Sequence, residues 1–238
     1  MKITIALIGY GNWGKILFKR LSRIYIINFV IRSKDNIKDI FNKVNWAIVS
    51  TPDKTHYHIL KKLINAKINI FCEKPLTSSH KSSIEIIKLA NKRKVKLYVS
   101  DIENYKKKKL IIKSKNYIYR SKEKKVRNYD FLRKLFYHDL YLLYPKLKAD
   151  NIKKIKFHKG SNYMKIFIKE KSKTFYFQYE LGKKKSHKIN NISLNSKKDY
   201  IGIMMKKVFL SRVNFKNNHL STINTMKILE MTKNARFH

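Results

Sequence analysis

Cysteine, proline and glycine are scarce in this chain of 238 residues, which contains one, three and six of them. The single cysteine, Cys72, excludes an internal disulfide and fits a reducing compartment. Long hydrophobic runs are also lacking, since the apolar stretch Ile3–Ile8 is far shorter than a membrane-spanning helix requires. That stretch leads directly into glycines, without the small-residue cleavage site of a signal peptide. We therefore expect a cytoplasmic protein that does not associate with a membrane.

Acidic residues are few as well, with 15 Asp and Glu against 56 Lys and Arg and a formal net charge of +41. One interpretation of this imbalance is a nucleic-acid or anionic-membrane partner. The other is compositional drift, because the enriched residues Lys, Ile, Asn, Tyr and Phe are those encoded by AT-rich codons. The lysines are spread along the whole chain, and no nucleic-acid-binding motif accompanies them. We favour drift and expect no specific nucleic-acid partner, although such a charge attracts anions at low salt.

The first part of the chain alternates short apolar runs with segments of helical spacing. This order predicts parallel βαβ units in a doubly wound Rossmann sheet, which we assign to residues 1–104. The runs are apolar throughout, as in strands that are covered on both faces. We expect strands at Lys2–Ile8, Ile26–Ile31, Trp46–Ser50, Ile68–Cys72 and Val95–Val99, helices at Lys15–Arg23, His56–Asn65 and Ser79–Lys92, and a short helix or turn at Asn36–Asn42.

The rest of the chain, residues 105–238, predicts a smaller α+β domain that serves substrate binding or oligomerisation. The lysine run Lys106–Lys109 and the basic stretch Lys113–Arg127 are typical of a connector. Two-residue alternation further on indicates a mainly antiparallel sheet. We expect strands at Ile152–Phe157, Met164–Ile168, Thr174–Tyr179 and Ile189–Leu194, and helices at Tyr129–Leu147, Tyr200–Val213 and His219–Thr232.

The strongest motif is Gly9-Tyr10-Gly11-Asn12-Trp13-Gly14, which matches G-x-G-x-x-G between the first strand and the first helix. In this pattern the first glycine allows a tight turn, the second lets the backbone approach a pyrophosphate, and the third lets the helix pack on the strand. The helix N-terminus then presents N–H groups to the phosphates. A plain glycine-rich turn is the alternative, but three of only six glycines stand here. We therefore expect Gly9, Gly11, Asn12, Trp13 and Gly14 to bind NAD or NADP.

The end of the second strand carries Arg32-Ser33-Lys34, where NAD-binding domains place an acidic residue against the ribose. An arginine near this position accommodates a 2′-phosphate, so Arg32 and Ser33 favour NADP over NAD. Two alternatives stay open. The basic residues can simply reflect the composition, or Asp35 can fill the acidic role if the strand runs longer.

Two further motifs follow predicted strands. They are Thr51-Pro52 with His56, and Glu73-Lys74-Pro75. In an open α/β sheet, ligands bind past the carboxyl ends of the strands. We therefore count Thr51, Pro52, His56, Glu73 and Lys74 as candidate cofactor contacts. For His56, we favour a role in ordering the loop after Thr51-Pro52 over a chemical role.

These motifs, in this order and rough spacing, resemble the glucose–fructose oxidoreductase/inositol dehydrogenase family (Gfo/Idh/MocA). His138-Asp139-Leu140 and Thr222–Met231 extend the resemblance into the second half, which is divergent and shorter than usual. The resemblance implies a dehydrogenase that moves a hydride between a nicotinamide and a hydroxyl-bearing carbon of a sugar, sugar nucleotide or cyclitol. It also implies a homo-oligomer formed through the open sheet of the second domain, where Phe175, Phe177 and Tyr179 alternate. No metal is implied.

The resemblance implies two catalytic residues, Lys74 beside the reacting hydroxyl and His138 as the general acid or base. One departure stands near His138, because Lys134 occupies the place where many members carry an aspartate one helical turn earlier. A lysine there repels an imidazolium. This leaves open an alternative, a catalytically degenerate dinucleotide-binding protein whose second domain binds a partner.

Overall fold

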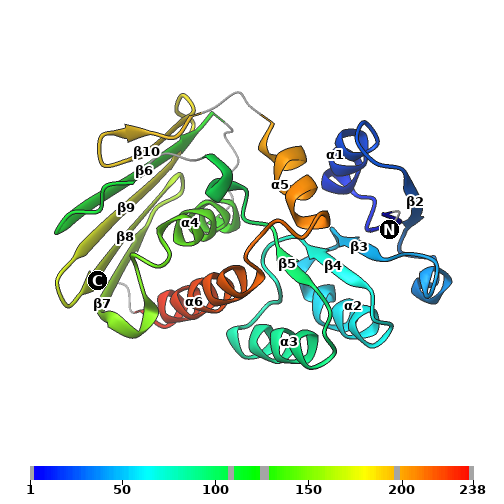
Figure 1. Cartoon of the computed structure of the whole chain (residues 1–238). Coiled ribbons are helices and arrows are strands. Elements are labelled where there is room, and N and C mark those ends of the chain that lie inside the picture. Colours follow the sequence, from blue (N-terminus) through cyan, green and yellow to red (C-terminus); the bar gives the residue numbers. More distant parts are fainter. Residues whose placement is uncertain (1–2, 107–109, 124–128, 196–198, 236–238) are drawn as a thin grey trace. The chain divides into compact units, whose positions relative to one another are not determined.

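The structure, a computed structural model, describes residues 3–106, 110–123, 129–195 and 199–235 (Figure 1). Most of the lysine run, at 107–109, lies outside these residues. The chain forms two compact units, the first comprising the chain up to Ile102 together with Asp199–Ile223, and the second Glu103–Lys198 with the chain from Asn224. A single boundary at residue 104 does not describe this division, because the chain returns to the first unit after residue 198.

The first unit is a Rossmann fold with a five-stranded parallel sheet in the order β2-β1-β3-β4-β5. Helices separate its strands, except that a 3₁₀ helix, η1 (Ile37–Ile40), replaces a full helix before β3. The strand order reverses beside β1, which is where open α/β sheets bind ligands. The elements are β1 (Ile5–Ile8), α1 (Asn12–Leu21), β2 (Ile27–Ile31), β3 (Trp46–Val49), α2 (Asp53–Asn65), β4 (Asn69–Cys72), α3 (His80–Lys92) and β5 (Leu97–Val99).

Two C-terminal segments complete this unit. In α5 (Tyr200–Phe209), the ring of Phe209 packs against Trp46 with 5.1 Å between ring centroids. In α6 (Phe215–Asn234), the amide of Asn218 accepts from the backbone N–H of Val99 and donates to its carbonyl, both at 2.9 Å. These bonds satisfy the backbone of the edge strand β5. Among the described residues, no helix has the length and apolar character needed to cross a membrane.

The second unit is built on a six-stranded sheet in the order β11-β10-β6-β9-β8-β7 (Figure 1). Only the β6–β9 pair is parallel, so the predicted mainly antiparallel α+β fold is confirmed. Helix α4 (Tyr129–Leu143) packs on one face, where the ring of Phe136 meets Phe177 edge-on. The other elements are η2 (Ile102–Lys106), β6 (Lys115–Lys122), η3 (Ala149–Asn151), β7 (Ile152–Lys159), β8 (Tyr163–Glu170), β9 (Thr174–Leu181), β10 (Ser186–Ile189) and β11 (Ile192–Ser193).

Two segments of this sheet differ from the secondary structure that the sequence predicted for them. The predicted connector Lys113–Arg127 contains β6, a strand inside the sheet, because its buried positions Asn116 and Arg120 are polar and conceal the usual apolar alternation. The predicted strand Ile189–Leu194 is a hairpin of β10 and β11. Its two-residue turn begins at Asn190, which adopts a φ of 51° as tight hairpin turns require.

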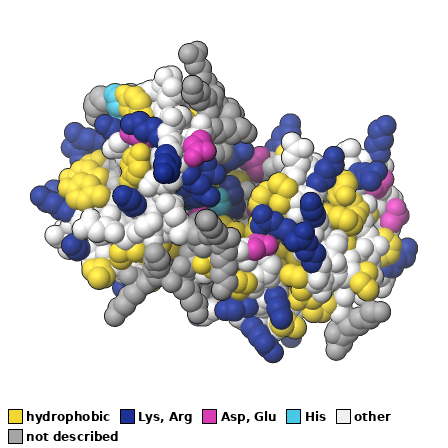
Figure 2. All heavy atoms as spheres, turned by 90° about the horizontal axis from the view of Figure 1, so that it is seen from above, with side chains coloured by type: hydrophobic (Ala, Val, Ile, Leu, Met, Phe, Trp, Pro, Cys, Tyr) yellow, Lys and Arg dark blue, Asp and Glu magenta, His cyan; other side chains and the backbone are white. Residues whose placement is uncertain are grey.

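The prediction that Phe175, Phe177 and Tyr179 line an open sheet face was also wrong. All three side chains are buried on the face that α4 covers. Side chains alternate along a strand, so the opposite face carries Tyr176, which stacks on Tyr117 of β6 at 5.0 Å. Figure 2 shows Lys and Arg side chains scattered over the visible face, with few acidic side chains among them.

Candidate cofactor-binding site

A cavity of about 1180 Å³ opens at the carboxyl ends of β1, β2 and β3, at the point where the strand order reverses. Its volume exceeds the range of about 300–1,000 Å³ that is usual for small-molecule sites, which suits an extended ligand. It brings together most of the residues that the sequence predicted for the cofactor, namely Gly9, Gly11, Asn12, Trp13, Arg32, Ser33, Thr51 and Pro52. Gly14, His56, Glu73 and Lys74 are not among its lining residues.

The glycine loop has the geometry that a pyrophosphate site needs. Gly9 adopts a φ of +96°, which side chains rarely allow, and this turns the chain sharply after β1. Helix α1 then begins at Asn12 after Gly11, which has no side chain to cap the first N–H groups of the helix. Because the helix dipole is positive at this end, these N–H groups suit an anion.

Gly14 and Gly11 are expected to respond differently to alanine. A Cβ on Gly14 would lie 2.2 Å from the carbonyl oxygen of Gly9, whereas a Cβ on Gly11 meets no atom within 4 Å. Gly14→Ala should therefore lower the free energy of unfolding by about 1–3 kcal/mol. Gly11→Ala should keep wild-type stability and weaken dinucleotide binding, because its methyl group blocks the approach of the pyrophosphate. Urea unfolding and cofactor titration of both variants measure the two effects, and equal stability of the variants would contradict the packing role of Gly14.

The end of β2 forms one wall of this cavity. The backbone N–H of Arg32 donates to Oδ2 of Asp35 at 2.7 Å, which ties the carboxylate into the turn. The guanidinium of Arg32 lies 5.3 Å from the ring centroid of Tyr10, a cation–π distance. Ser33 lines the same wall. The wall therefore offers a guanidinium, a hydroxyl and the carboxylate of Asp35, which also lines the cavity and has one oxygen bonded to the backbone.

His56, on α2, connects the loops that follow β3 and β4. Its Nε2 lies 2.9 Å from the carbonyl oxygen of Thr51, and its Nδ1 lies 2.9 Å from that of Pro75. The side chain is buried, with 1% of its surface exposed. These contacts hold the Thr51-Pro52 segment against the loop that carries Lys74.

Glu73 and Lys74 begin the loop after β4. Glu73 is buried, and its carboxylate accepts hydrogen bonds from the side chains of Trp13 and Ser100. Because Trp13 lines the cavity, this bond connects the glycine loop to the Glu73–Lys74 segment. Lys74 is half-buried and precedes a cis peptide bond to Pro75. Cys72, the last residue of β4, lies in the core, and its burial together with the neighbouring Glu73 raises the pKa of its thiol.

Because the carboxyl of Glu73 is buried, we expect the Glu73→Gln variant to be more stable than wild type, by an amount that depends on pH. Burial raises the pKa of Glu73, although hydrogen bonds from Trp13 and the charge of Lys74 oppose this rise. The wild-type side chain therefore stabilises the fold below its unfolded pKa and loses that contribution as the pH rises through the folded pKa. Glu73→Gln resembles the protonated form, so its unfolding midpoint should exceed that of wild type at neutral pH and equal it below about pH 4. Equal midpoints at both pH values would contradict this prediction.

His138, the other predicted catalytic residue, lies on α4 in the second unit, whereas Lys74 belongs to the first. The side chain of His138 is half-buried. Lys134 lies one helical turn earlier and is exposed to solvent. Its charge is therefore screened by water, which weakens the predicted repulsion of an imidazolium.

The sequence analysis missed several residues of the cavity wall. Thr55, His58, Ile59 and Lys62 lie on α2 and line the cavity together. Their spacing of three to four residues marks one face of a helix, and this spacing was the signal that could have indicated them. Further lining residues that were not predicted are Tyr10, Lys15, Asn36, Ile37 and Ser50.

Comparison with known proteins agrees with this geometry. Residues 19–101 match the family model of the Gfo/Idh/MocA proteins, described as an oxidoreductase family with an NAD-binding Rossmann fold. This match assigns residues 19–101, which lie in the first unit, to the NAD-binding Rossmann fold of that oxidoreductase family. The matched residues include the ends of β2, β3 and β4, whereas the glycine loop Gly9–Gly14 precedes them. A sequence comparison with curated proteins finds no match.

Solved structures extend the likeness in fold over both units of the chain. The UDP-N-acetylglucosamine 3-dehydrogenase from Acidithiobacillus ferrooxidans superposes with a TM-score of 0.83 at 11% identity, over 99% of this chain and 98% of that chain. The dehydrogenase MviM from Clostridium difficile gives 0.74 at 16% identity, over 98% and 99%. The WlbA dehydrogenase from Thermus thermophilus, solved with NAD and alpha-ketoglutarate, gives 0.76 at 10% identity, over 95% and 94%. At these identities the likeness shows the fold.

Proposed function

We propose that this protein is an NADP-preferring dehydrogenase that acts on a hydroxyl-bearing carbon of a sugar, sugar nucleotide or cyclitol. The observation that carries the cofactor preference is the wall at the end of β2, where Arg32 and Ser33 line the cavity beside Asp35, whose carboxylate accepts from the backbone N–H of Arg32. A guanidinium at this place suits a 2′-phosphate, whereas NAD sites present a carboxylate to the ribose. NAD is the alternative cofactor.

The residues of the cavity suit a dinucleotide along its length. Gly11, Asn12 and the first N–H groups of α1 would hold the pyrophosphate, because any side chain at Gly11 would occupy its approach. Arg32 and Ser33 would hold the phosphorylated ribose. Thr51 and Pro52 line the cavity at the end of β3 and would contact the rest of the dinucleotide. When bound, the nicotinamide accepts or supplies the hydride.

Two side chains of this chain would manage the proton and the charge at the substrate oxygen. The Nζ of Lys74 would donate a hydrogen bond to that oxygen and stabilise the negative charge that develops on it. The imidazole of His138 would take or return the proton, since histidine titrates near neutral pH. Glu73, which bonds to Trp13, would hold the segment that carries Lys74.

The substrate class rests on two supports. The structural neighbour from Acidithiobacillus ferrooxidans is by its name a dehydrogenase of a sugar nucleotide. The net charge of +41 favours anionic ligands of this kind through long-range attraction. We propose that the protein acts in the cytoplasm as a homo-oligomer.

The cofactor preference predicts an unequal response to Arg32→Ala. Loss of the guanidinium should weaken NADPH binding about tenfold or more, because a hydrogen bond to a charged group contributes about 1.5–3 kcal/mol. NADH binding should change by less than about threefold. Fluorescence titrations of wild type and variant give the two dissociation constants. Lys34→Ala serves as control, since Lys34 is exposed and does not line the cavity. Equal losses for both cofactors would contradict the assignment to the 2′-phosphate.

The proposed function is tested by titrating the protein with NADPH and NADH and then screening sugar nucleotides, sugars and cyclitols for turnover. Micromolar binding with a preference for NADPH, followed by turnover of one substrate class, is the expected result. Cofactor binding without turnover of any class would favour a catalytically degenerate protein with a partner-binding second unit. The lysine at position 134, one turn before His138, is the observation that favours this second function.

A further inference from the structure

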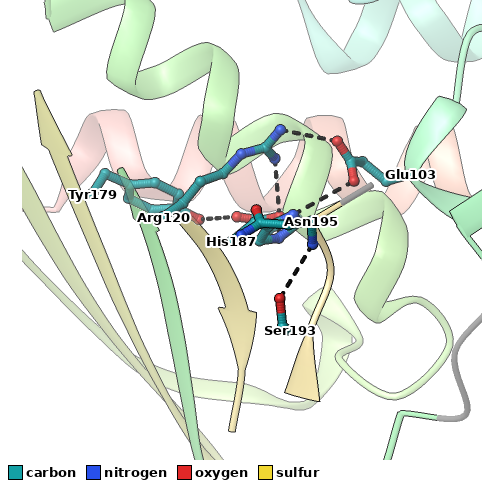
Figure 3. Close-up of polar contacts among 7 residues, drawn as sticks. Glu103, Arg120, Tyr179, His187, Ser193 and Asn195 are labelled. Atoms are coloured by element: carbon teal, nitrogen blue, oxygen red, sulfur yellow. Dashed lines mark hydrogen bonds and ion pairs between the residues drawn. The ribbon is translucent and has the colours of Figure 1, made fainter. Parts of the chain in front are cut away.

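A cluster of charged side chains is buried in the second unit, between the sheet and α4 (Figure 3). Arg120 of β6 lies 2.9 Å from Oε1 of Glu103 and 3.2 Å from Oδ1 of Asp139. His187 of β10 places Nε2 at 2.8 Å from Asp139 and Nδ1 at 3.6 Å from Glu103. The Tyr179 hydroxyl donates to the other oxygen of Asp139 at 2.9 Å. Two buried carboxylates therefore face the two basic groups and fix their positions.

A cavity of about 130 Å³ adjoins this cluster. Basic side chains predominate in its wall, and none of the described residues that line it is acidic. This volume leaves room for one small oxyanion. Asn195 lines this cavity together with His187. The lining residues on which the argument depends are Arg120, Lys122, Lys185, Ser186, His187 and Asn195.

The two buried basic groups of this wall have hydrogen-bonding capacity left for a ligand. His187 is 4% exposed; its Nε2 faces Asp139 at 2.8 Å, whereas its Nδ1 lies 3.6 Å from Glu103, beyond hydrogen-bond distance. The ion pairs of Arg120 engage its two terminal nitrogens, whereas a guanidinium carries five N–H donors. Buried donors without a suitable acceptor are unfavourable, so an anion in this cavity would satisfy them.

We propose that this cavity binds a small tetrahedral oxyanion, either free phosphate or the phosphate group of a larger molecule, through Arg120, His187 and Lys185. Glu103 and Asp139 do not touch the ligand. Their ion pairs hold Arg120 and His187 in place at the cavity wall, as outer groups hold the ligands of a metal. Lys122, Lys185, Ser186 and Asn195 complete the wall at the solvent side. The site lies within the second unit and does not depend on the proposed dehydrogenase function.

The test is a titration of the full chain with inorganic phosphate at constant pH. Chloride is withdrawn as phosphate is added, so that the ionic strength stays constant. The side-chain signals of His187 are followed by NMR, and His187→Gln identifies them among the eight histidines. We expect a saturable shift of the His187 signals with one phosphate bound per chain. No saturable shift would overturn the proposal. A second titration with glycerol 3-phosphate distinguishes the two possible ligands. If glycerol 3-phosphate binds more tightly than inorganic phosphate, the site takes the phosphate group of a larger molecule. If it binds more weakly, the site takes free phosphate.

The net charge of the protein requires a control for unspecific attraction. Lys185→Gln should raise the apparent dissociation constant roughly two- to fivefold, as expected for an exposed charge. Lys188→Gln removes the same charge three residues away, from an exposed position next to His187 whose side chain points to the opposite face of β10. It should leave the dissociation constant unchanged. Equal effects of the two variants would show that the general field of the lysines attracts phosphate, and would overturn the site. Both positions are exposed, so both variants should fold.

Discussion

Arg120→Met is expected to lower the free energy of unfolding by about 3–5 kcal/mol, as is typical when one partner of a buried ion pair is removed. The substitution leaves Glu103 and Asp139 buried without the guanidinium that faces both. Burial alone would lower the pKa of Arg120, but Asp139 and Glu103 raise it, so the wild-type side chain stays charged. Urea unfolding followed by circular dichroism measures the loss.

A second arginine offers a matched control for this experiment. Arg20 also forms an ion pair, with Asp199 at 2.9 Å, but both side chains are largely exposed. Arg20→Met should therefore change the free energy of unfolding by less than about 1 kcal/mol. Similar losses in the two variants would contradict the stabilising role of the buried cluster.

The same cluster determines how this contribution varies with pH. Burial alone would raise the pKa of Asp139, but the nearby His187 and Arg120 lower it below the ordinary range. The contribution of Asp139 to stability is thus present above its unfolded pKa and is lost as the pH falls through its folded pKa. The difference between wild type and Arg120→Met should consequently shrink in acid.

Lys74→Ala is expected to reduce turnover by about 10²–10⁴-fold while leaving the dissociation constant of NADPH within about threefold of wild type. This prediction depends on the proposed function, in which Nζ of Lys74 stabilises charge on the substrate oxygen. Lys74 does not line the dinucleotide cavity, so its removal should spare cofactor binding. Stopped-flow turnover with the substrate found in the screen, combined with fluorescence titration of NADPH, separates the two effects.

Lys81→Ala is the matched control, because Lys81 is an exposed lysine on α3. It should leave both turnover and cofactor binding unchanged. Lys74→Arg keeps the charge but alters the donor geometry, so it should recover only part of the lost turnover. Wild-type turnover in Lys74→Ala would contradict the catalytic role of Lys74, but it would leave the proposal of cofactor binding by the Rossmann unit intact.

The first unit was predictable because its signals are local. Continuous apolar runs such as Trp46–Val49 indicate strands that are covered on both faces, and the three glycines Gly9, Gly11 and Gly14 mark one tight turn. Motifs at strand ends then converge because the strands are parallel and adjacent. Thr51 and Arg32, which are 19 residues apart in the sequence, therefore line the same cavity.

The second unit was less predictable because its decisive interactions are long-range. β6 was missed since Arg120 at a buried position is polar, and its partners Glu103 and Asp139 come from η2 and α4. The face of β9 was also assigned wrongly. Alternation of Phe175, Phe177 and Tyr179 shows that these side chains share a face, but only packing against α4 decides that this face is buried.

The sequence by itself determined the Rossmann fold, the glycine loop and the family resemblance, because these depend on the conformational demands of glycine and on apolar periodicity over a few residues. Only the tertiary structure decided that Asp35 is engaged by the backbone of Arg32, that His56 joins two loops, and that His187 lies between two buried carboxylates. These arrangements unite groups that are far apart in the chain or depend on side-chain direction. Hydrogen bonds and burial select such arrangements when the chain packs, and local sequence patterns do not encode them.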